Sequence, residues 1–157
     1  MRAAHELASG ALTGNPEPIP GALQTLHAIA LVDPDTILGV VALYSTALQD
    51  LQIDHAVSGV DLVRAASSAY GEAFSFSDED FEDVHTSAAG FPPVDDDGAV
   101  DILRWSVGLI LLAAAAGVLA RMPVLSFTLA VRTSAQLRFA LDAPPLPSPL
   151  ADGLEEL

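Results

Sequence analysis

The chain contains no cysteine and no lysine, and only 6% of its residues are aromatic. Without cysteine there is no disulfide, no thiolate ligand for a metal ion and no cysteine nucleophile. All six basic residues are arginines, and they face 21 aspartates and glutamates, which gives a formal net charge of -15. A chain this acidic repels phosphate backbones and anionic lipid surfaces, so we expect no nucleic-acid partner. We expect a partner to be a cation or a basic protein surface instead.

The motifs that identify common enzyme classes are also absent from the sequence. It contains no G-x-S-x-G, no G-x-G-x-x-G and no P-loop, so the usual signatures of serine hydrolases, dinucleotide enzymes and nucleotide hydrolases are missing. None of the four histidines has a second histidine four residues away, which removes the H-E-x-x-H zinc motif. No apolar leader precedes Pro16, so we expect no signal peptide and a cytoplasmic protein.

Apolar residues make up 51% of the chain, and most of them are alanine, leucine and valine. These residue types favour closely packed helices over aromatic-rich sheets, so we predict a mainly α fold. A length of 157 residues is enough for one domain with a core of its own. We expect residues 1–142 to form a single compact bundle of about six helices, and residues 143–157 to form a proline-rich C-terminal tail.

Helix boundaries are marked by residues that cap or break helices. Asp33 followed by Pro34 is the clearest start, because the carboxylate can cap the helix and proline is tolerated at its first position. Ser77, with an aspartate three residues later, has the pattern of a capping box. Asp54 is expected to cap the helix that follows it. The helices expected ahead of residue 95 cover 3–13, 21–32, 34–51, the segment from Asp54 to about Gly71, and 77–88.

The most apolar segment, residues 105–120, follows three aspartates that we expect to open its helix, Asp95, Asp96 and Asp97. The segment is apolar on all sides, which is typical either of a central buried helix or of a membrane span. Its charge-free run is shorter than the ~20 residues that a bilayer requires. We therefore predict a buried helix at the centre of the bundle. A membrane-associated protein that uses residues 105–131 is an alternative.

Residues 124–141 show two conflicting patterns. Apolar residues alternate with other residues along the segment, a period of two that is typical of β-strands. Its alanines, leucines, glutamine and arginines favour a helix, and Pro123 suits a first helical position. No glycine, asparagine or proline lies near Thr133 and Ser134 to form the turn of a hairpin. We predict a helix and keep a β-hairpin as the alternative.

Acidic residues are concentrated between Arg64 and Arg104, a stretch with no other positive side chain. Carboxylate oxygens suit Mg²⁺, Ca²⁺ or Mn²⁺, but no EF-hand register fits here, and acids of this kind are usually solvated. Glu82 and His85 have the E-x-x-H spacing of di-metal helical bundles, which use two such pairs where this chain has one. The candidate metal ligands are Asp78, Glu82, His85 and Asp101.

The tail ends in three leucines at helical spacing, Leu150, Leu154 and Leu157. These leucines can dock in the groove of a partner or fold back over their own core. Together, the high apolar content, the missing catalytic motifs and this tail predict a small, acidic, non-catalytic interaction or assembly protein. We expect it to be homo-oligomeric, to need no cofactor, and to bind a protein partner through apolar helix surfaces or the tail. The alternative is a metal-binding helical-bundle enzyme that uses carboxylates and His85.

Overall fold

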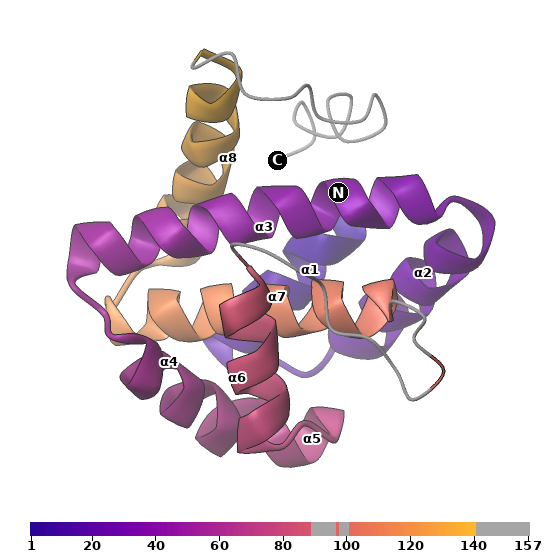
Figure 1. Cartoon of the computed structure of the whole chain (residues 1–157), viewed down its shortest axis with the longest axis horizontal. Helices are drawn as coiled ribbons and strands as arrows, with labels where there is room; N and C mark the ends of the chain where they lie inside the picture. The colour runs from indigo at the N-terminus through magenta and orange to yellow at the C-terminus, as the bar shows by residue number, and fades with distance from the viewer. Residues whose placement is uncertain (89–96, 98–100, 141–157) are drawn as a thin grey trace.

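The computed structural model describes residues 1–88, 97 and 101–140, with the backbone only from 135 to 140. None of these residues belongs to a strand, so the mainly α prediction is confirmed and the hairpin alternative for 124–141 is wrong. Figure 1 shows the helices arranged around α7. In chain order they are α1 (Arg2–Thr13), α2 (Ile19–Val32), α3 (Pro34–His55), α4 (Gly59–Ala66), the π-helical turn η1 (Ser67–Gly71), α5 (Glu72–Phe74), α6 (Asp78–Ser87), α7 (Ile102–Leu119) and α8 (Val124–Ala140).

The core is built around α7, as the apolar run predicted. Every residue from Trp105 to Gly117 is buried, because α1, α3, α4 and α6 all pack against this helix. Of the surrounding helices, α3 packs most extensively against α7, and the two helices run in the same direction (Figure 1). Both helices are long and apolar enough to cross a membrane, but most of each lies buried inside the fold, as is typical of core helices.

Several helix ends follow the local sequence signals. Gly14 ends α1 in the left-handed conformation, with a φ of 70° that glycine adopts without strain. The Asp33 carboxylate accepts hydrogen bonds from the backbone N–H of Thr36 at 3.4 Å and from its hydroxyl at 2.6 Å, so it caps α3 as predicted. Ser77 and Asp80 form the predicted capping box at the start of α6.

Two predicted helix starts are wrong. Asp54 lies inside α3, which continues to His55 and ends at Ala56 in the left-handed conformation. The cap of α4 is Ser58, whose hydroxyl accepts the backbone N–H of Asp61 at 3.2 Å. At α7 the capping carboxylate belongs to Asp101, which accepts the backbone N–H of Arg104 at 3.0 Å. Asp97 lies in a turn before the helix, and Asp95 and Asp96 are outside the described residues.

Candidate functional site

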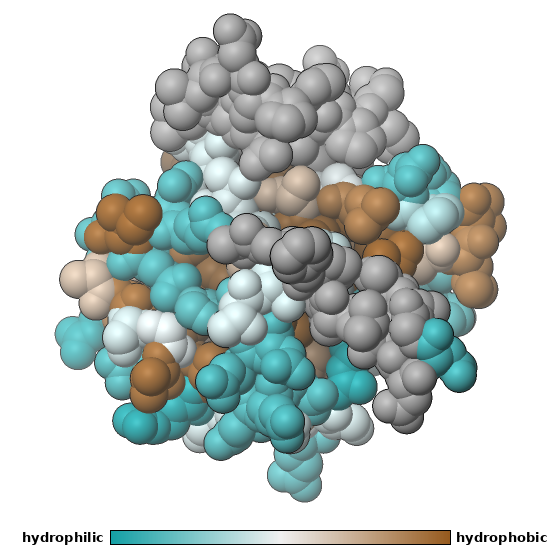
Figure 2. All heavy atoms as spheres, in the orientation of Figure 1, coloured by the Kyte–Doolittle hydropathy of each residue, from teal (hydrophilic) through white to brown (hydrophobic). Residues whose placement is uncertain are grey.

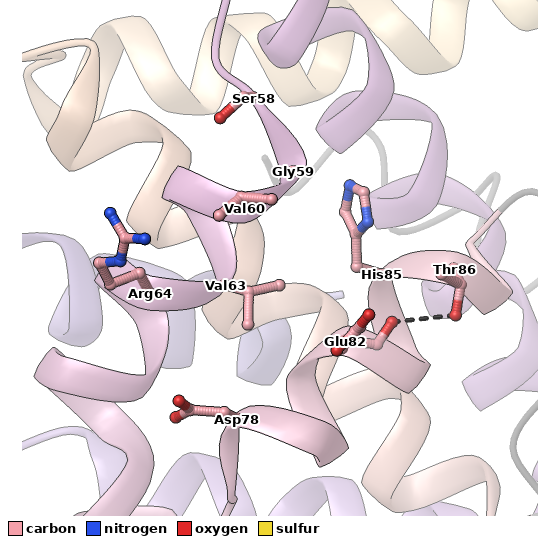
Figure 3. A pocket seen from close by; sticks show the side chains of 9 residues that line it. All are labelled: Ser58, Gly59, Val60, Val63, Arg64, Asp78, Glu82, His85 and Thr86. Carbon is pink, nitrogen blue, oxygen red and sulfur yellow. Dashed lines mark hydrogen bonds between the residues drawn. The ribbon is translucent and has the colours of Figure 1, made fainter.

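Three of the four candidate ligands line one groove between α4 and α6 (Figure 3). Asp78, Glu82 and His85 are spaced i, i+4 and i+7 along α6, so they share one face of that helix. The groove, which we call the α4–α6 groove, has a volume of about 470 Å³. Its remaining lining residues are Ser58, Gly59, Val60, Val63, Arg64 and Thr86. Asp101, the fourth candidate, does not line it and instead caps α7.

His85 is half-buried and held in one orientation by the end of α3. Its Nε2 lies 3.1 Å from the side-chain oxygen of Gln52, while the Gln52 amide nitrogen donates to the carbonyl of Val57 at 3.3 Å. Because that amide nitrogen faces Val57, the Gln52 oxygen faces the histidine, and Nε2 carries the proton that is donated to it. Burial lowers the pKa of His85, and the nearby charge of Glu82 only partly offsets this. The imidazole is therefore neutral at neutral pH.

The first residue of α4 makes room for this imidazole. A Cβ atom on Gly59 would lie 2.7 Å from Cε1 of His85, a distance that real Cβ contacts do not show. A side chain of any size at position 59 would therefore displace the ring from its place against α4. Gly59 is thus a positioning residue for the His85 wall of the groove.

The groove lining carries the two carboxylates of Asp78 and Glu82 against the single cation of Arg64, so it is acidic overall. Asp78 accepts a hydrogen bond from the hydroxyl of Ser67 in the π-helical turn. Arg104 is ion-paired with Asp80 and lies over the ring of Phe76, and it does not line the groove. Burial raises the pKa of Asp80, but its hydrogen bonds from the capping serine and the Arg104 charge outweigh this and hold the pKa below its ordinary value.

The opposite wall of the groove offers no further metal ligand. It presents two valines, Val60 and Val63, together with the cation of Arg64, which lies 3.8 Å from Asp61. Among the residues that the structure describes, no three histidine, aspartate or glutamate side chains are grouped so that they could hold a metal ion. Metal binding by Asp78, Glu82 and His85 stays a hypothesis, supported by their common groove alone.

A second surface feature is a set of large hydrophobic side chains that face solvent. Figure 2 shows such side chains at both ends of the view, over the last turns of α3 and over the corner between α2 and α3. Three lie at that corner, Leu31, Val32 and Leu38, and Val60 lines the α4–α6 groove. The remaining five lie where α3 and α7 end and α8 begins, a surface that we call the apolar end: Ile53, Val118, Leu119, Leu125 and Leu129.

Four of the six arginines lie in one stretch of the chain that contains no acid. Residues 102–141 contain four arginines and no aspartate or glutamate. Two of these arginines, Arg121 and Arg132, flank the exposed leucines of α8, and neither forms an ion pair with another described residue. The sequence prediction missed this separation, although the acid-free run is visible in the sequence.

The prediction also missed the contribution of α4 to the site, because no local motif connects Gly59, Val60 and Val63 with α6. The tail leucines Leu150, Leu154 and Leu157 lie outside the described residues. What the described surface offers is an acidic groove with two valines in its wall, and an apolar end with unpaired arginines. No protein-family model, no curated protein and no solved structure matches the chain.

Proposed function

We propose that this chain is a small, acidic, non-catalytic interaction protein that assembles with further copies of itself. The observation that carries the proposal is the apolar end, where five large hydrophobic side chains stay exposed while the core of the described residues is formed by others. Soluble proteins rarely expose contiguous apolar surface without an interaction to cover it.

The energetics favour an apolar contact over a charged one. The five side chains of the apolar end are between 44% and 77% exposed. Complete burial of one such side chain stabilises a contact by roughly 1.5–3 kcal/mol, before the cost of association is subtracted. Copies that carry a net charge of -15 repel each other. Contacts are therefore most favourable where at least one of the two surfaces is free of acids, and the apolar end includes part of the acid-free run.

Light scattering coupled to size-exclusion chromatography tests the proposal over a wide range of protein concentrations. We expect the wild type to form an oligomer and the combined variant Leu125→Ser and Leu129→Ser to dissociate. The matched control is Leu31→Ser with Val32→Ser at the α2–α3 corner, which removes side chains that are at least as exposed and is expected to leave the oligomer intact. A wild type that stays monomeric at every concentration would overturn the proposal of self-assembly.

Metal binding is the second candidate function, because Asp78, Glu82 and His85 line one groove. Native mass spectrometry of protein purified without chelators reads bound metal and subunit number from one sample. A metal-loaded species that is lost in Glu82→Ala would favour this function. A metal-free wild type would remove it.

A further inference from the structure

We infer that the α4–α6 groove of one copy receives the exposed face of α8 from another copy. The inference rests on the proposed self-assembly and names the two surfaces that meet. Three features of the molecule carry it: the side chains that line the groove, the residues on the exposed face of α8, and the opposite charges of the two surfaces.

The groove combines apolar and acidic side chains in a way that suits an amphipathic helix. Val60 is 67% exposed, and Val63 is half-buried beside it. Asp78 and Glu82 are exposed on the facing helix, and Figure 3 shows both on the α6 side of the groove opposite these valines. A ligand that covers the valines also meets both carboxylates. Helices that dock in grooves do so through side chains at i, i+4 and i+7.

The exposed face of α8 carries the complementary pattern. Leu125 and Leu129 are 71% and 53% exposed, and Arg132 follows them at the i+7 position. Phe127 and Val131 are buried on the other side of the helix, which packs against α3 and α1. The outward face of α8 therefore presents two exposed leucines and then the half-buried Arg132, which forms no ion pair with another described residue.

Charge selects α8 among the helices of a second copy. Docking an acidic helix in an acidic groove would place like charges together, which costs affinity. Among the described helices, only α7 and α8 carry arginine without any aspartate or glutamate, and α7 is the buried centre of the fold. On α8, Leu125 and Leu129 can cover the valines of the groove while Arg132 meets Glu82 or Asp78.

Two charge reversals test this contact. Glu82→Arg alters the groove and leaves α8 unchanged, while Arg132→Glu alters α8 and leaves the groove unchanged. We expect each variant to weaken association by about tenfold or more, since close charge pairs at interfaces contribute that much. An equimolar mixture of the two variants is expected to associate again, because each intact surface then finds its partner. Combining both reversals in one chain is expected to restore assembly as well.

Glu79→Arg is the matched control. Glu79 is exposed on the same helix and does not line the groove, so this variant makes the same change in net charge outside the contact. We expect it to assemble at least as well as the wild type. Circular dichroism of every variant confirms that the helices are retained before association is measured.

The outcomes separate the inference from the proposed function. If the wild type assembles and both reversals leave assembly unchanged, the groove-to-α8 contact is wrong while self-assembly stands. Equal weakening by Glu79→Arg and Glu82→Arg would also overturn the contact, because net charge alone would then explain the effect. A monomeric wild type would overturn both. Loss in each single variant with recovery in the mixture supports the contact.

Discussion

Replacing Gly59 with alanine is the sharpest test of how the groove is built. The added Cβ would lie 2.7 Å from Cε1 of His85 and 3.3 Å from both ring nitrogens. The imidazole must then move, and its 3.1 Å hydrogen bond to Gln52 is lost or lengthened. We expect Gly59→Ala to destabilise the fold and to alter the groove, although the substitution is small and lies in a helix.

The expected magnitude combines two opposing contributions. Overpacking costs roughly 1–3 kcal/mol, and loss of one hydrogen bond costs roughly 0.5–1.5 kcal/mol within that range. Alanine gains up to about 1 kcal/mol over glycine in a helix, which offsets part of the cost. With the full offset, the free energy of unfolding should therefore fall by up to about 2 kcal/mol. For a chain of this size that corresponds to a decrease in Tm of up to about 8 °C.

Chemical denaturation measures this change, with Gly21→Ala as the control. Gly21 is exposed near the start of α2, and apart from its chain neighbours and its own helix backbone no atom lies within 4 Å of the position that an added Cβ would take, so its replacement should stabilise the fold slightly. In a His85→Ala background, Gly59→Ala should lose its penalty, because the ring it displaces is gone. Equal effects of Gly59→Ala with and without the imidazole would refute the proposed contact.

Three further predictions concern other parts of the fold. Tyr44→Phe should be neutral or stabilise by up to ~2 kcal/mol in urea unfolding, because the hydroxyl of this buried tyrosine has no hydrogen-bond partner among the described residues; a loss above ~1 kcal/mol would contradict this. Asp101→Ala should lower the stability to unfolding by about 1 kcal/mol while Asp101→Asn retains most of it, since either polar side chain caps α7. Burial lowers the pKa of both His5 and His85 below 6.5, so the unfolded chain takes up protons first as pH falls. The free energy of unfolding is then at its full value above pH 6.5 and decreases below that pH. Melting curves between about pH 7.5 and about pH 5.5 should show a smaller decrease in Tm for His85→Gln than for the wild type.

The sequence predicted correctly those helix starts at which the capping side chain bonds to groups within the first turn of the helix. Asp33 and Ser77 each bond to groups three residues away, so the sequence alone places them. The alternation of apolar residues in 124–141 suggested a strand only if every apolar residue was assumed to be buried. In α8 the buried residues are Phe127, Thr128, Val131 and Ser134, at helical spacing, while Leu125 and Leu129 face outward. Packing against α3 decides this, and one sequence does not contain that information directly.

The candidate site was predictable only along α6. The spacing of Asp78, Glu82 and His85 places them on one helix face, but what faces them depends on contacts between distant segments. The Gln52 partner of His85 lies 33 positions earlier in the chain. Asp101 lies apart from these three residues because its carboxylate caps its own helix, where it accepts the backbone N–H of Arg104.

The parallel arrangement of α3 and α7 has a consequence for how the chain folds. Parallel neighbours cannot be joined by a short turn, because the chain must return to the end at which the first helix began. Residues 56–101 therefore separate α3 from α7 and must be synthesised before the two helices can meet. During synthesis, a nascent chain that ends before residue 102 leaves α3 without the helix it packs against. Contacts so distant in sequence also slow folding, because the closure entropy is lost before the contact forms. The last third of the chain therefore decides when the first third becomes stable.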